Sequence, residues 1–269
     1  MWDEELLETK KIAVNAGKAI IAIYNSKDFG LEYKSDASPL TKADRAANQI
    51  ITEGLKEKFP NYAILSEEEQ DNKERLKNDF CFVVDPLDGT KEFLKRNGQF
   101  TVNIALSFRH ESVMGVIYVP VIRLLYWASK GNGAYRGKVT ETGLIERIIK
   151  LKVSDNLDMR TNRVVMSSSH GCQEMDDLIK KHHLNNYVRM GSSLKGCLIA
   201  EGNAEIYYRH NPTMEWDTAA MQCIVEEAGG IFRQMDGSRM YYNRENSLNS
   251  KGFYIVNNKK NILDTNFEQ

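Results

Sequence analysis

Neither sign of charge dominates this sequence. Its 36 lysine and arginine residues stand against 37 aspartate and glutamate residues, so the formal net charge is −1. Proteins that bind nucleic acid by neutralising its phosphates usually show a basic excess or a long basic stripe, and neither is visible here. We therefore expect no nucleic-acid polymer as a partner, and any anionic ligand must be held by a local group of residues.

Long hydrophobic runs are missing as well. The longest apolar stretches, such as residues 80–84 and 115–121, fall well short of the roughly 20 residues that a membrane-spanning helix needs. The N-terminus carries Asp3, Glu4 and Glu5 where a signal peptide would carry positive charge. We expect no transmembrane segment and no export.

Cysteine is scarce, and its four occurrences are widely separated: Cys81, Cys172, Cys197 and Cys223. None belongs to a CxxC pair or has a histidine at the spacing typical of zinc ligands. Because their neighbours are mostly apolar, we expect reduced thiols in the core of a cytoplasmic protein.

The first half of the chain shows helical and then strand-like patterns. Apolar residues recur at helical spacing over residues 6–24 and again after Thr41, where Thr41 and Asp44 have the spacing of a capping box. Short apolar runs between residues 102 and 136, separated by turn signals, predict an antiparallel meander. The interval 141–158 lacks a clear period.

The second half alternates strand-like and helical segments, which indicates a mixed α/β arrangement. Strands are expected at 163–167, 187–190 and 204–208, and helices at 173–183, 193–201 and 216–228. Gly229-Gly230 is suited to ending the last helix. We therefore predict two domains: residues 1–145, with the antiparallel sheet and most acidic site residues, and residues 146–269, with the α/β pattern.

The most informative segment runs from Val83 to Thr90. A strand is expected to end in Asp85, Pro86 sets a turn, and Asp88-Gly89-Thr90 can begin a short helix. Two carboxylates would then lie beside free backbone N–H groups, an arrangement that can hold hard cations and a phosphate. Taken alone, such an Asp-x-x-Asp pair is more simply an N-cap on a surface turn.

Three further acidic residues lie at the ends of expected elements: Asp44, Glu67 and Asp217. Each has a plain structural explanation as a cap, a solvated turn or a favourable partner of a helix dipole. Together with Asp85 and Asp88 they indicate a multi-metal phosphate site.

These motifs together resemble the signature of the inositol monophosphatase-like superfamily, which contains magnesium-dependent, lithium-sensitive phosphomonoesterases. The resemblance covers residues 41–230 and rests on Asp44, Glu67-Glu68, the segment from Asp85 to Thr90, Trp216-Asp217 and Gly229-Gly230. It implies a layered α-β-α-β-α sandwich of the α+β or α/β class.

Within the superfamily, the details are most similar to the bacterial 3′(2′),5′-bisphosphate nucleotidases of the CysQ type. Residues 34–44 and Lys91-Glu92-Phe93 fit that type, and His210 stands where inositol enzymes carry a sugar-binding glutamate. The implied reaction removes the 3′-phosphate of adenosine 3′,5′-bisphosphate, or of its sulfated relative. An inositol-1-phosphate or broad sugar-phosphate phosphatase is the alternative, and a non-catalytic nucleotide-sensing protein is a third interpretation.

The resemblance also implies roles for individual residues. Two or three Mg²⁺ ions would be held by Glu67, Asp85, the Leu87 carbonyl, Asp88 and Asp217. Thr90 with either Asp44 or Glu67 as the base would orient the attacking water. The substrate would contact Leu87, Asp88, Gly89, Thr90, His170, Ser192, Lys195, Arg209 and Asp217.

Among these contacts, the Gly89 and Thr90 N–H groups would hold one phosphate, and Lys195 and Arg209 the second. His170 would reach the base or ribose, although a lone loop histidine is often merely solvated. Lys195 has its own alternative, a surface lysine with a buried stem. We expect a cytoplasmic monomer or homodimer; relatives of this type are sometimes assigned to the inner face of the bacterial membrane, which nothing in this sequence requires.

Overall fold

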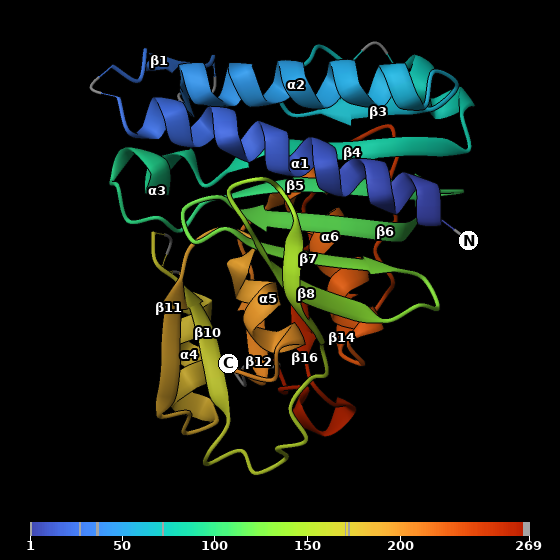
Figure 1. Cartoon of the computed structure of the whole chain (residues 1–269). Helices are drawn as coiled ribbons and strands as arrows, with labels where there is room; N and C mark the ends of the chain where they lie inside the picture. The colour runs from blue at the N-terminus through green and yellow to red at the C-terminus, as the bar shows by residue number, and fades with distance from the viewer. Residues whose placement is uncertain are drawn as a thin grey trace.

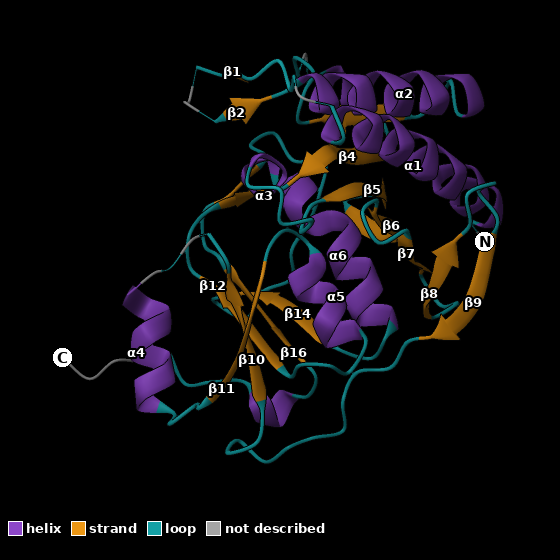
Figure 2. Cartoon of the chain, turned by 60° about the vertical axis from the view of Figure 1, so that its left-hand side comes forward, coloured by secondary structure: helices purple, strands orange, loops and turns teal. Residues whose placement is uncertain are grey.

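The chain folds into five alternating layers of helices and sheets (Figure 1). The computed structural model describes residues 2–26, 28–35, 38–71, 73–169, 171 and 173–265. Helices α1 and α2 cover a seven-stranded sheet, α5 and α6 lie between that sheet and a five-stranded one, and α4 covers the far face of the second sheet (Figure 2). This arrangement confirms the expected α-β-α-β-α sandwich.

The outer helix layer follows the predicted apolar spacing. Helix α1 spans Asp3–Tyr24 and α2 spans Lys42–Lys58. The Thr41 hydroxyl accepts from the Ala43 amide, and the Asp44 carboxylate accepts from the Thr41 amide, so the predicted capping box is confirmed. Asp44 is thereby fixed, in a buried position, in the first turn of α2.

The first sheet has the strand order β3-β4-β5-β6-β7-β8-β9. Strands β5 to β8 form the predicted meander and β9 extends it, whereas β3 and β4 run parallel. Their bounds are Ala63–Ser66 (β3), Phe80–Asp88 (β4), Thr101–Phe108 (β5), Glu111–Val119 (β6), Leu124–Ser129 (β7), Ala134–Val139 (β8) and Ile145–Lys150 (β9). Alternate residues of β4 are buried on opposite faces: Phe82 packs toward α1 and α2, and Val83 toward α5 and α6.

Two details of this sheet differ from the sequence predictions. Strand β4 does not end at Asp85 but continues to Asp88, with an irregular register against β5 between these residues. The segment without a clear period contains β9, which is an exposed edge strand. Because both faces of β9 are largely exposed, its sequence does not alternate between apolar and polar residues. The division into residues 1–145 and 146–269 falls at the start of β9 and stays a prediction.

The second sheet has the order β11-β10-β12-β16-β14. Its strands are Arg163–Ser167 (β10), Asn186–Met190 (β11), Ile206–Arg209 (β12), Ile231–Gln234 (β14) and Phe253–Val256 (β16). Its helices are Gln173–Lys181 (α4), Leu194–Ala200 (α5) and Glu215–Glu227 (α6). Gly229, with φ 93°, follows the end of α6 as expected, while β14 and β16 were not predicted.

Short elements complete the chain: β1 (Glu32–Tyr33) pairs with β2 (Pro39–Leu40), and β13 (Thr213–Met214) pairs with β15 (Leu248–Asn249). The 3₁₀ helix η1 (Glu74–Lys77) lies between β3 and β4, helix α3 (Thr90–Leu94) follows β4, and the 3₁₀ helix η2 (Lys259–Asn261) lies near the C-terminus. Within the described ranges, no helix combines the length and apolar character that crossing a bilayer requires.

Candidate active site

A cleft of about 230 Å³ opens where the two halves of the chain meet. Its walls come from the end of β4, the start of α3, the start of α5, the end of β12 and the first turn of α6. The cleft collects many of the predicted residues, which are Glu67, Asp88, Gly89, Thr90, Ser192, Lys195, Arg209 and Asp217. Tertiary structure therefore joins positions that lie up to 150 residues apart (217 − 67).

Three carboxylates cluster at this cleft, and two of them, Asp88 and Asp217, belong to its lining. Asp85 and Asp88 come from the end of β4, and Asp217 comes from the first turn of α6. One oxygen of each lies within 4.8 Å of one oxygen of the other two. Such a separation allows the three side chains to share cations.

The electrostatics of this cluster suit a divalent cation. Burial raises the pKa of Asp85 well above its usual range, and the charges of Glu67 and Asp88 raise it further. Burial and the neighbouring Asp88 likewise raise the pKa of Asp217 to about 7. Buried carboxylates that repel one another are stabilised by a bound cation, and an all-oxygen donor set fits Mg²⁺.

Asp88 is held firmly in place by residues from β5 and from the turn before α5. Its Oδ2 accepts hydrogen bonds from Asn103 Nδ2 at 3.2 Å and from Ser192 Oγ, Ser193 N and Ser193 Oγ, each at 2.7 Å. Ser192 has φ 55°, a left-handed conformation that is uncommon for serine. All of these bonds fall on one oxygen, so they orient the carboxylate while its second oxygen can serve a ligand.

Glu67 lies beside the cluster and faces a lysine. Its amide donates to the Val84 carbonyl at 3.1 Å, which continues the pairing of β3 with β4. Lys34 Nζ donates to Glu67 Oε1 at 2.8 Å and to Glu68 Oε1 at 2.6 Å. Burial raises the pKa of Glu67 although Lys34 opposes this shift. The structure thus places a cationic group next to the carboxylate that the resemblance assigns to a metal.

Thr90 connects the turn after β4 with α2. Its hydroxyl lies 3.1 Å from Asp44 Oδ1 and 3.4 Å from the Leu87 carbonyl oxygen, and can donate to either. Gly89, with φ 94°, precedes α3, and a Cβ there would lie 3.2 Å from the Gln99 carbonyl oxygen. Only glycine takes this conformation readily. These residues form the wall of the cleft next to the carboxylates.

Two basic side chains, those of Lys195 and Arg209, also line the cleft. Lys195 is buried, and its Nζ donates to the Ser192 carbonyl at 2.7 Å and lies 5.8 Å from the Tyr207 ring. Burial lowers the pKa of Lys195, while Asp88 counteracts this. Arg209 Nε is buried and has no hydrogen-bond partner among the described residues. His170, also predicted as a substrate contact, lies outside the described residues.

Sequence reasoning did not find the residues that hold Asp88, namely Asn103 and Ser193, nor Thr101, which contacts Ser192 Oγ at 2.6 Å. Thr101 and Asn103 belong to a strand that is otherwise almost wholly apolar and buried. Buried polar residues need hydrogen-bond partners. The two polar residues within an apolar strand were therefore the sequence feature that could have indicated this network.

With this fold and site, the chain belongs to the inositol monophosphatase family, which its sequence matches over residues 2–265. It is 40% identical over 248 residues to the 3′(2′),5′-bisphosphate nucleotidase CysQ of Salmonella typhimurium, covering 91% of this chain and 97% of that relative. The crystal structure of CysQ from Bacteroides thetaiotaomicron superposes with a TM-score of 0.83 at 39% identity, covering 96% of this chain and 99% of the other.

More distant members share the fold. The inositol monophosphatase from Anabaena has a TM-score of 0.72 at 24% identity, with 94% of this chain and 89% of that chain covered. Proteins of this family are metal-dependent phosphatases, and the cluster of Asp85, Asp88 and Asp217 could hold a metal ion.

Proposed function

We propose that this chain is a 3′(2′),5′-bisphosphate nucleotidase. It removes the 3′-phosphate of adenosine 3′,5′-bisphosphate, giving AMP and inorganic phosphate, and it also accepts the sulfated relative of that substrate. Relatives that carry this name are 32–40% identical over at least 91% of the chain. The observation that carries the proposal is one cleft whose lining contains Asp88 and Asp217 of the carboxylate cluster together with Lys195 and Arg209.

The metal part of the proposal concerns two or three Mg²⁺ ions. Glu67, Asp85, Asp88, Asp217 and the carbonyl of Leu87 would hold them, and Lys34 would leave Glu67 when they bind. When bound, the ions would supply an activated water and neutralise charge on the phosphate and the leaving oxygen.

The residues of the chain itself would position the reactants. Thr90 Oγ1 donates to Asp44 Oδ1, so the Thr90 oxygen is free to accept a proton from the attacking water and pass its own to Asp44. Glu67 is the alternative base. The backbone N–H groups of Gly89 and Thr90 would hold the phosphate that is cleaved.

The second phosphate explains the two basic residues. Within the described part of the chain, the Lys195 ammonium donates one hydrogen bond, to the Ser192 carbonyl, and keeps further donors for an anion. Arg209 adds a guanidinium whose buried Nε lacks a partner among the described residues. Ser192 would act through Asp88, which its hydroxyl contacts, and His170 remains a proposed contact of the base or ribose.

Comparing substrates tests this proposal. Purified protein with Mg²⁺ should release phosphate from adenosine 3′,5′-bisphosphate with a higher kcat/KM than from inositol 1-phosphate. The reverse order would favour the inositol or sugar-phosphate alternative, and no release from any phosphomonoester would favour a nucleotide sensor. A cytoplasmic location is part of the proposal and is supported by the free, buried thiols of Cys81, Cys197 and Cys223. Association with the inner membrane finds no support here, and we propose a monomer or homodimer.

A further inference from the structure

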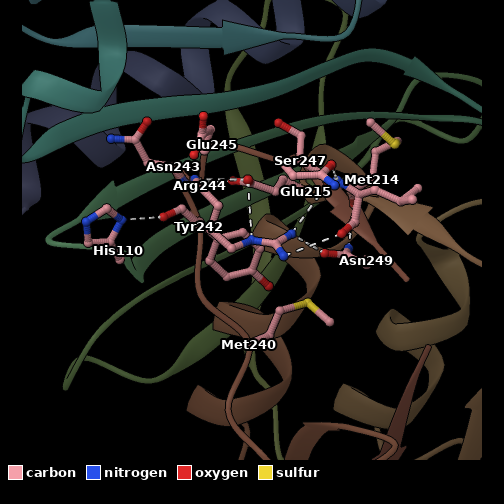
Figure 3. A network of polar contacts seen from close by, with 12 residues as sticks. His110, Met214, Glu215, Met240, Tyr242, Asn243, Arg244, Glu245, Ser247 and Asn249 are labelled. Atoms are coloured by element: carbon pink, nitrogen blue, oxygen red, sulfur yellow. Dashed lines mark hydrogen bonds and ion pairs between the residues drawn. The ribbon is translucent and has the colours of Figure 1, made fainter. Parts of the chain in front are cut away.

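Residues 240–249, here called the strap, lie against the first turn of α6 (Figure 3). Tyr242, Asn243 and Asn249 of the strap are almost completely buried. The strap has no part in the reaction described above. Its contacts nevertheless reach two segments that each carry a proposed metal ligand.

The first of these contacts involves Glu215, whose side chain is fully buried. Its Oε2 accepts from the Asn243 amide at 2.5 Å, its Oε1 accepts from the Arg244 amide at 3.0 Å, and Arg244 Nε lies 3.4 Å from Oε1 (Figure 3). Glu215 precedes Asp217 by two residues. Because both oxygens of the Glu215 carboxylate accept hydrogen bonds from the strap, the first turn of α6 is held in place.

The strap also holds the backbone around Asp217. The Glu215 amide donates to the Ser247 carbonyl at 2.9 Å, and Asn249 Nδ2 donates to the Met214 carbonyl at 2.8 Å. The Met214 amide in turn donates to Asp217 Oδ2 at 2.6 Å. Each bond restricts the place of the Asp217 carboxylate.

The second segment is 67–79, which begins with Glu67 and contains Arg75. The buried Arg75 guanidinium donates to Asn243 Oδ1 and to the Arg244 carbonyl, each at 2.8 Å. Asn243 Nδ2 returns bonds to the carbonyls of Arg75 at 3.1 Å and Asn78 at 3.2 Å. Arg75 thus ties this segment to the same two strap residues that Glu215 contacts.

We propose that Glu215 and Arg75 are positioning residues of the active site, which act through the strap to fix Asp217 relative to Glu67. Neither is among the described residues that line the cleft, and neither is proposed as a metal ligand or a substrate contact. The proposal rests on the proposed function, because it takes both carboxylates as metal ligands. Residues that orient metal ligands typically change metal affinity by about 10- to 100-fold when they are replaced.

The decisive variant is Glu215→Gln, which keeps the shape of the side chain. One of its oxygens becomes an NH₂ group that cannot accept from the Asn243 or Arg244 amide. We expect the dissociation constant for Mg²⁺, measured by titration calorimetry without substrate, to rise about 10-fold or more. The Mg²⁺ concentration for half-maximal activity should rise in parallel, with little change in KM at saturating Mg²⁺.

The matched control is Glu227→Gln at the other end of α6. The Glu227 carboxylate also accepts from two backbone amides, those of Gly131 at 2.8 Å and Gly133 at 2.7 Å. This variant should lose comparable thermal stability and keep its Mg²⁺ affinity within about twofold. If Glu215→Gln behaves like Glu227→Gln, its role is purely structural and the proposal is overturned.

Arg75→Lys tests the positioning proposal independently. It replaces Glu215→Gln as the test if that variant does not fold. It keeps the positive charge but loses the forked contact with Asn243 and Arg244, so Mg²⁺ binding should again weaken about 10-fold. Unchanged Mg²⁺ affinity in folded Arg75→Lys overturns the proposal. Failure of the proposed function would look different, because wild-type protein would then bind no Mg²⁺ or bind it without hydrolysing adenosine 3′,5′-bisphosphate.

Discussion

The hydroxyl of Thr90 lies 3.1 Å from Asp44 Oδ1 and joins the turn after β4 to the first turn of α2. Asp44 Oδ2 accepts from the amide and the hydroxyl of Thr41. One carboxylate therefore caps a helix with one oxygen and faces the active site with the other. The structural and the functional interpretation of Asp44 are compatible.

Thr90→Val tests the role of this contact in catalysis. Valine has nearly the same shape but cannot accept a proton from water or donate one to Asp44. We expect kcat to fall by about 10²- to 10³-fold, in the range of general acid–base effects, with KM little changed. Thr90→Ser retains the hydroxyl and should keep most of the activity; a fully active valine variant would remove Thr90 from the mechanism.

Asp88→Asn should nearly abolish phosphate release while the protein stays folded. The asparagine oxygen can still accept from Asn103 and Ser193, but the charge that binds the cation is lost. Mg²⁺ affinity should fall by more than the roughly 10- to 100-fold typical of outer-shell changes. Asp79→Asn, at an exposed ion pair with Arg109, is the control and should remain active. Retained turnover in Asp88→Asn would contradict the assignment.

Lys195→Met should affect bisphosphate substrates more than monophosphates. Loss of a charge-assisted hydrogen bond of about 1.5–3 kcal/mol corresponds to roughly 10- to 150-fold in kcat/KM for the bisphosphate. Methionine fills most of the buried space, so the fold should persist. Kinetics on adenosine 3′,5′-bisphosphate and adenosine 3′-phosphate give the comparison, with exposed Lys77→Met as the control. Equal losses on both substrates would show that Lys195 does not bind the second phosphate.

Gly115→Ala concerns the packing of α6 against the first sheet. A Cβ at Gly115 would lie 2.4 Å from the carbonyl oxygen of Ala220 and 2.9 Å from its Cα. Backbone atoms can move aside only at a large cost in energy. The free energy of unfolding, measured by urea denaturation, should therefore fall by about 1–3 kcal/mol or more. At Gly171, a Cβ would have no neighbour within 4 Å among the residues that the structure describes. Gly171→Ala should be nearly neutral, and equal stability of both variants would refute this explanation.

Much of the fold could be predicted from local patterns. Helices α1 and α2, the capping box at Thr41 and Asp44, the meander and the glycine after α6 are all confirmed. These features depend on contacts between residues close in sequence, or on alternating burial that leaves a periodic pattern. Strands β9, β14 and β16 lack such a pattern: β9 is largely exposed, and β16 is buried at all four positions.

The sequence by itself determined the motif residues, the family they resemble and the helices that carry Asp44 and Asp217. Only the tertiary structure decided which oxygen of Asp88 is held, that Asn103 and Ser193 hold it, and that the strap links Glu215 with Arg75. A motif records which residue types are present at a given spacing. Hydrogen bonds between residues 90 to 168 positions apart depend instead on how the two sheets pack around α5 and α6, which no local pattern contains.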